Sequence, residues 1–161
     1  MDAIKIYSTY FIRFLKARLE YRGDFFAGVA ANVLTALSGL LFVLFLIDGE
    51  RVTSLGGWSR GEVLFIYGYS MLPMAIFMMV APNLYQFGDK YIIQGQFDRV
   101  LLRPLSAVCQ VLFESFNLES IGSGLTGVGV IFYASKQLEH HWTTLDFVWL
   151  VFSAFSGGVI L

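Results

Sequence analysis

Long apolar stretches alternate with short polar ones along most of this chain. Four stretches are candidates for crossing a bilayer: Phe25–Ile47, Val63–Pro82, Val111–Tyr133 and Leu145–Leu161. A helix rises about 1.5 Å per residue, so the ~30 Å hydrocarbon core needs about 20 apolar residues. The apolar runs are continuous and lack the two-residue alternation of a membrane barrel strand. The sequence therefore predicts an all-α polytopic membrane protein with four spanning helices.

The fourth stretch, residues 145–161, is still apolar at Leu161, where the sequence stops. A membrane protein rarely stops inside the bilayer. We therefore expect residues 1–161 to form a single transmembrane domain that is incomplete at its C-terminus, with the fourth helix truncated.

Residues 3–22 have a different pattern, with apolar and charged side chains on opposite faces of a helix. The apolar positions recur every three or four residues: Ile4, Tyr7, Phe11, Phe14, Leu15 and Leu19. Aromatic groups opposite cations are typical of a helix lying at the headgroup boundary. The pattern predicts an N-terminal interfacial helix; a packed cytosolic helix, or a flank that only sets topology, is the alternative.

The positions of Lys and Arg predict the orientation. If the N-terminus is cytoplasmic, eight of the 11 positive residues lie on the cytoplasmic side. Positive charge is enriched in cytoplasmic flanks. The N-terminus and the loop 83–110 are therefore expected in the cytoplasm, in a multi-pass protein of the cell (inner) membrane.

Composition agrees with this class. The chain is 57% hydrophobic and 14% charged, against about 25% charged in soluble domains. A net charge of -1 gives no basic surface for nucleic acid, so none is expected as a partner. Cys109 is the one cysteine, which excludes an intrachain disulfide.

Several runs in the sequence match part of a nucleotide-, phosphate- or metal-binding motif, but their context does not support such a site. Gly122, Gly124 and Gly127 spell G-x-G-x-x-G, but a dinucleotide site needs a preceding strand, and these lie inside an apolar span. Gly56 and Gly61 have the spacing of a phosphate-binding loop, yet no lysine follows Gly61. The His140-His141 pair lacks metal-ligand spacing. We expect no metal, no cofactor and no catalytic residues.

Three polar residues interrupt the third stretch: Glu114, Asn117 and Glu119. On a continuous helix Glu114 and Asn117 share a face and Glu119 faces elsewhere. A charge inside the bilayer is costly, so these side chains are expected to line a translocation path or to join helices. Alternatively the third span begins near Leu118, and Glu114 is then interfacial.

The loop 83–110 predicts two short helical segments separated by Gly95, because apolar side chains share a face on each side of it. Aromatic residues are interleaved with charged ones. This pattern favours contact with a soluble partner; a lipid-facing re-entry helix without a partner is the alternative.

This loop carries a family resemblance. Residues 95–106 read GQFDRVLLRPLS, which resembles the signature G-x-x-D-x-x-L-L-R-P-x-S of type-2 ATP-binding-cassette exporter permeases. Tyr21-Arg22-x-x-Phe25 and the segment Gly57-Trp58 followed by Gly61-Glu62-Val63 also resemble that family. The resemblance implies six spans, of which this chain has the N-terminal portion. It also implies a homo- or heterodimer with a second permease subunit.

The resemblance further implies that the loop docks on a separate ATP-binding-cassette ATPase subunit and passes on its closure. The matching positions are Tyr91, Phe97, Asp98, Arg99 and Arg103. The permease would not be an enzyme itself and would move substrate by alternating access. Two alternatives stay open: a non-transporting structural or regulatory membrane protein, and an intramembrane enzyme using the glutamates of the third span.

Overall fold

The computed structural model describes residues 12, 16, 21–48, 57–102, 106–139 and 141–160; most of these are helical, and none of them forms a strand. The long helices are α2 (Arg22–Asp48), α3 (Arg60–Val80), α7 (Ile121–Gln137) and α8 (Thr144–Ile160). Short helices join α3 to α7: α4 (Pro82–Tyr85), the π-helix η1 (Phe87–Ile93), α5 (Phe97–Leu101), α6 (Ala107–Phe113) and the 3-10 helix η2 (Leu118–Ser120). The predicted all-α class is confirmed.

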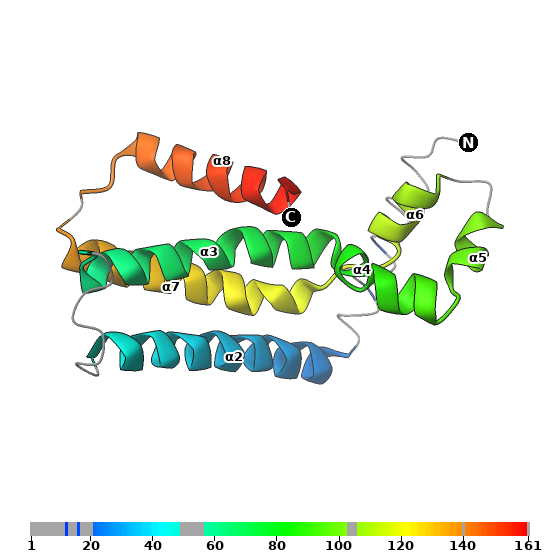
Figure 1. Cartoon of the computed structure of the whole chain (residues 1–161), viewed down its shortest axis with the longest axis horizontal. Coiled ribbons are helices and arrows are strands. Elements are labelled where there is room, and N and C mark those ends of the chain that lie inside the picture. The colour runs from blue at the N-terminus through cyan, green and yellow to red at the C-terminus, as the bar shows by residue number, and fades with distance from the viewer. Residues whose placement is uncertain are drawn as a thin grey trace.

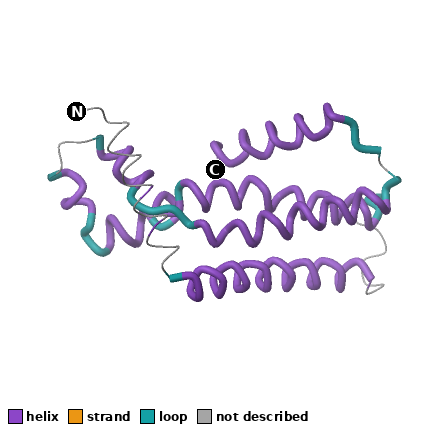
Figure 2. The backbone as a smooth tube through the Cα atoms, turned by 180° about the vertical axis from the view of Figure 1, so that it is seen from behind, coloured by secondary structure: helices purple, strands orange, loops and turns teal. Residues whose placement is uncertain are grey.

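The four long helices lie side by side in a bundle (Figure 1). The pair α3 and α7 forms the centre, with α2 packed on one side and α8 on the other, as the reverse view also shows (Figure 2). Successive long helices run in opposite directions. The start of α2 therefore lies at the same end of the bundle as α4, α5 and α6.

Two of the described helices, α2 and α3, are long and apolar enough to cross a membrane; α8 is a shorter apolar helix of 17 residues. The outer side of α2 is covered by large apolar side chains. Leu34, Leu41 and Phe45 are 64%, 66% and 65% exposed. Such a surface suits lipid or another apolar helix, because water would be a poor solvent for it.

Glycines set the close approach of the central helices. A Cβ atom on Gly68 of α3 would lie 2.9 Å from the carbonyl oxygen of Gly127, and one on Gly127 would lie 2.8 Å from that of Gly68. On Gly122 it would lie 2.6 Å from the carbonyl oxygen of Val29 in α2. Small residues allow helices to pack this closely in lipid. Glycines of the G-x-G-x-x-G run thus bring α7 against α2 and α3.

The range 111–133, predicted as one span, is not one helix. Helix α6 ends at Phe113, the chain is non-helical from Glu114 to Asn117, and η2 and α7 follow. Asn117 caps η2, since its side chain accepts a hydrogen bond from the Glu119 N–H, and asparagine favours such caps over helix interiors. The alternative start near Leu118 coincides with the first residue of η2.

The predicted interfacial helix over 3–22 lies almost wholly outside the described residues. Its last member, Arg22, is the first residue of α2. The other predicted spans differ from the helices by a few residues: 25–47 lies within α2, 63–82 corresponds to α3, and 145–161 corresponds to α8.

Candidate functional site

The loop between α3 and α7 folds as a separate small unit beyond one end of the bundle (Figure 1). We call α4, η1, α5 and α6 together the loop unit. Its core consists of Tyr91, Val100 and Val111, which are at most 6% exposed. Phe87 stacks on Tyr91 with ring centroids 5.4 Å apart and meets Phe97 edge-on at 5.8 Å. The loop unit therefore has an apolar core of its own.

Two local features shape this unit. Gly95 has a φ of 67°, which glycine adopts without the steric cost of a Cβ atom, and it separates η1 from α5. This agrees with the helix end predicted there. The preceding helix η1 is a π-helix, closed by a hydrogen bond of 3.0 Å from the Gln94 N–H to the Asp89 carbonyl. π-Helical turns are rare in proteins, and those that occur are often found at functional sites.

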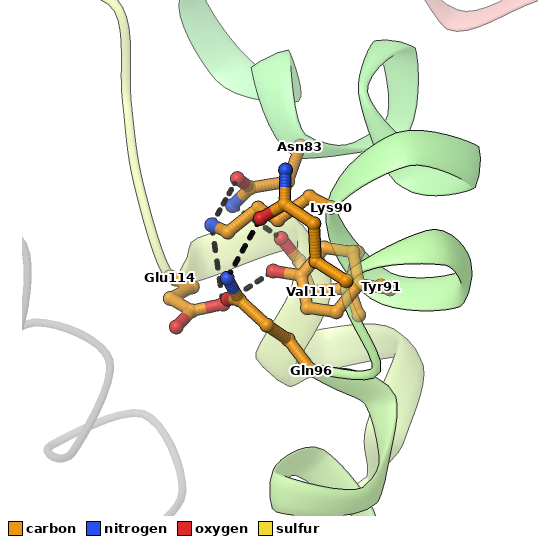
Figure 3. A network of polar contacts seen from close by, with 7 residues as sticks. Asn83, Lys90, Tyr91, Gln96, Val111 and Glu114 are labelled. Atoms are coloured by element: carbon orange, nitrogen blue, oxygen red, sulfur yellow. Dashed lines mark hydrogen bonds and ion pairs between the residues drawn. The ribbon is translucent and has the colours of Figure 1, made fainter.

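Polar side chains join the segments of the loop unit (Figure 3). The Tyr91 hydroxyl donates a hydrogen bond to the Glu114 carboxylate. Lys90 Nζ lies 2.9 Å from Asn83 Oδ1 and 3.7 Å from Glu114 Oε2. Asn83 Nδ2 donates to the Val111 carbonyl at 2.9 Å, which satisfies an acceptor in the last turn of α6. One connected network thus links α4, η1, α6 and the residue after it.

The surroundings of the Tyr91 hydroxyl keep it protonated, so that it acts as a hydrogen-bond donor. Its side chain is 1% exposed. Burial raises the pKa of Tyr91 well above its ordinary value, and the hydrogen bond to Glu114 raises it further. A hydrogen bond from a neutral donor to an ionised carboxylate is stronger than one between neutral groups. The Lys90–Glu114 ion pair is partly exposed, so it contributes little by itself.

The residues predicted to touch the ATPase are divided by the structure. Tyr91 is buried in the core of the loop unit, and Phe97 packs against that core. Asp98 and Arg99 are exposed on α5. Arg103 lies outside the described residues. The two predicted aromatic anchors therefore stabilise the loop unit from inside, and only charged members of the set reach its surface in the described part.

The apolar surface of the loop unit comes from residues that the sequence analysis did not single out. Ile92 and Ile93 at the end of η1, and Leu101 and Leu102 at the end of α5, are 67%, 79%, 61% and 85% exposed. A signal was present, because each pair adjoins a residue that faces the core, Tyr91 or Val100. Neighbouring positions in a short helix cannot all be buried on one side.

The polar residues Glu114, Asn117 and Glu119 are not brought together. Glu114 and Asn117 do not share a helix face, because the chain between them is not helical. Glu114 belongs to the network of the loop unit. The Asn117 N–H donates to the Met79 carbonyl of α3 at 3.1 Å, and the Glu119 side chain lies against Gly28 of α2.

A second feature lies within the bundle, between α2, α3 and α7. It is an open groove of about 360 Å³ lined by Ala31, Asn32, Thr35, Ala36, Tyr67, Met71 and Ser123. The Tyr67 hydroxyl donates to the Ala36 carbonyl at 2.9 Å and so joins α3 to α2. Among the described residues, no three His, Cys, Asp or Glu side chains gather as metal ligands.

Comparison with known proteins assigns a family. Residues 33–161 match the family described as ABC-2 family transporter protein, a match that includes most of α2 and all later elements. No match was found among curated proteins or among solved structures. The match agrees with the sequence resemblance to type-2 exporter permeases and with the apolar helices. The chain therefore belongs to the ABC-2 transporter family, as a membrane permease component of an ABC transporter.

Proposed function

We propose that this permease exports its substrate by alternating access, driven by ATP hydrolysis in a separate ATPase subunit that docks on the loop unit. The permease would act as a homo- or heterodimer in the cell (inner) membrane, with its N-terminus and the loop unit in the cytoplasm. The family membership supports a transporter component and, in general, an ATPase partner. The direction of transport is taken from the sequence resemblance.

One observation carries the proposal: a loop with its own apolar core extends beyond the bundle and exposes large apolar side chains. Leu102 and Ile93 are 85% and 79% exposed, next to the exposed charges of Asp98 and Arg99. Large apolar side chains on a unit outside the spanning helices favour a covering partner. Apolar contacts with a polar rim suit a reversible interface.

The sequence supports a division of labour between subunits. It contains no G-x-x-x-x-G-K-[ST] run, so no lysine is placed to bind the β- and γ-phosphates of ATP. A folded loop unit also suits transmission of force, because a packed element moves as one body whereas a flexible strand of chain would absorb the movement.

Co-purification with an ATPase tests this function. The permease is co-expressed with a candidate ATP-binding-cassette ATPase from the same genome and captured by affinity. We expect the ATPase to be retained, and the double variant Ile93→Ser/Leu102→Ser to lower the retained amount about tenfold or more, as for loss of central interface contacts. The matched control is Trp58→Ser, a 56% exposed apolar residue just before the start of α3, whereas the loop unit follows the end of α3.

The outcomes separate the alternatives. If no ATPase is retained by the wild-type protein, the exporter function is refuted and a non-transporting membrane protein is favoured. If the wild-type protein retains the ATPase and the double variant retains it equally, the exposed apolar residues of the loop unit are not the docking surface. In that case the ATPase docks elsewhere on the permease, and the exposed apolar side chains of the loop unit face lipid.

A further inference from the structure

The connection between the loop unit and α7 is short and is held at both ends. At one end, Glu114 accepts a hydrogen bond from the buried Tyr91 hydroxyl and lies 3.7 Å from Lys90 Nζ. At the other end, the Asn117 N–H donates to the Met79 carbonyl in the last turn of α3 at 3.1 Å. Between these two anchors the chain is non-helical. This segment is the direct connection along the chain from the loop unit to α7, while α4 joins the other end of the loop unit to α3.

We propose that Glu114 is a positioning residue that fixes the point at which the chain leaves the loop unit, so that movement of the docked loop unit passes through the short segment 114–117 and turns or shifts α7. This inference rests on the proposed function, since it needs a partner that moves the loop unit. It differs from the sequence-based expectation that Glu114 lines the translocation path. Its carboxylate is directed toward Tyr91 and Lys90 of η1 (Figure 3).

The geometry favours a rigid tie over a loose contact. Tyr91 is held by the stacked ring of Phe87 and by the core residues Val100 and Val111, so its hydroxyl has a fixed position. Lys90 is held separately, by its hydrogen bond of 2.9 Å to Asn83. Glu114 thus meets one hydrogen-bond donor, Tyr91, and one cation, Lys90, and the positions of both are set by other contacts. Without these contacts the end of α6 would no longer be fixed to η1, and a longer stretch of chain before α7 would absorb the movement.

Two substitutions test the interaction of Glu114 with Tyr91 and Lys90, and they differ in the group that they remove. Tyr91→Phe keeps the buried ring and removes the donor. Glu114→Gln keeps an acceptor for the hydroxyl and removes the charge that faces Lys90. Glu139→Gln is the matched control, because it neutralises an exposed carboxylate in the turn after α7, whereas the loop unit lies before the start of α7.

The readout is the movement of α7 in the full-length complex with its ATPase, in nanodiscs. Spin labels at Lys136 of α7 and Phe45 of α2, with other cysteines replaced by serine, report a distance at the end of the bundle away from the loop unit. We expect ATP with vanadate to change this distance in the wild-type complex and in Glu139→Gln. In Tyr91→Phe the fraction of complexes in the changed state should fall on the order of fivefold or more, in the usual range of coupling between sites. ATPase retention should be unchanged.

Combining the variants separates a tie from general packing. If Tyr91 and Glu114 act as one unit, Tyr91→Phe/Glu114→Gln is no worse than Tyr91→Phe alone; independent packing effects would add. An unchanged distance response in both single variants overturns the inference while the exporter function stands. Loss of ATPase retention in Tyr91→Phe also overturns it, because the pair then shapes the docking surface only. A wild-type complex that never forms refutes the proposed function and this inference with it.

Discussion

The crossing of α3 and α7 yields a prediction that compares three glycines of a single helix. Alanine at Gly127 places its Cβ atom 2.8 Å from the carbonyl oxygen of Gly68 and 2.9 Å from the Cβ atom of Met71. Alanine at Gly124 places it 3.3 Å from the Cβ atom of Ala75. At Gly129 no atom lies within 4 Å. The substitution is the same at each position, so helix propensity cancels and packing decides the order.

The magnitudes follow from these distances. A contact below 3.0 Å with a backbone oxygen cannot be relieved by a side-chain rotation, so α3 and α7 must separate, and overpacking of this kind costs about 1–3 kcal/mol. Gly129→Ala should be neutral or stabilising by up to about 1 kcal/mol, because alanine is the better helix former. Gly124→Ala should fall between the two.

Stability is measured on the full-length protein in lipid nanodiscs, as the temperature at which half of the protein has aggregated or unfolded. We expect the order Gly129→Ala, wild type, Gly124→Ala, Gly127→Ala from most to least stable, with several degrees between the first and the last. Equal stability of Gly127→Ala and Gly129→Ala would refute the packing of α3 on α7 described above.

Three further predictions concern the loop unit and the bundle. Gly95→Ala forces alanine to a φ of 67° and should destabilise the loop unit by about 1–2 kcal/mol, seen as faster tryptic cleavage within it; Gly88→Ala, with open space around it, should cleave at the wild-type rate. Because the pKa of Tyr91 is raised on folding, its stabilising effect is fully present below its ordinary pKa of about 10 and is lost as pH rises beyond it; protease resistance of the loop unit should fall above that pH in the wild type and depend less on pH in Tyr91→Phe. Glu119→Gln keeps the shape of the side chain, so expression should be unchanged while the ATPase rate of the complex changes; an unchanged rate removes Glu119 from the translocation path.

Most of the bundle could be predicted from the sequence because long uncharged runs leave little choice of structure. The predicted span 25–47 and the helix α2 differ by a few residues, and the same holds for α8. The range 111–133 was wrong as a single span because Val111 is apolar for another reason. It fills the core of the loop unit, and composition does not distinguish an apolar residue buried in a small folded unit from one facing lipid.

The sequence predicted where the candidate site lies along the chain, but not which of its side chains are buried. A resemblance over residues 95–106 located the loop, yet it could not say which apolar side chains face inward. Tyr91 and Phe97 turned out to form the interior, and Leu102 the surface. Within η1 the wider turn of the π-helix also changes which positions share a face. The docking roles of Asp98, Arg99 and Arg103 stay predictions.

The separate core of the loop unit has a consequence for synthesis. Its core residues all lie between Phe87 and Val111, so every residue that closes this core emerges from the ribosome before α7 does. The central pair, by contrast, joins Gly68 to Gly127 across the whole loop. Chain emerging from the ribosome folds where its partners are already present. The loop unit can therefore fold before α7 packs on α3. A folded unit at that point hinders passage of the loop across the bilayer.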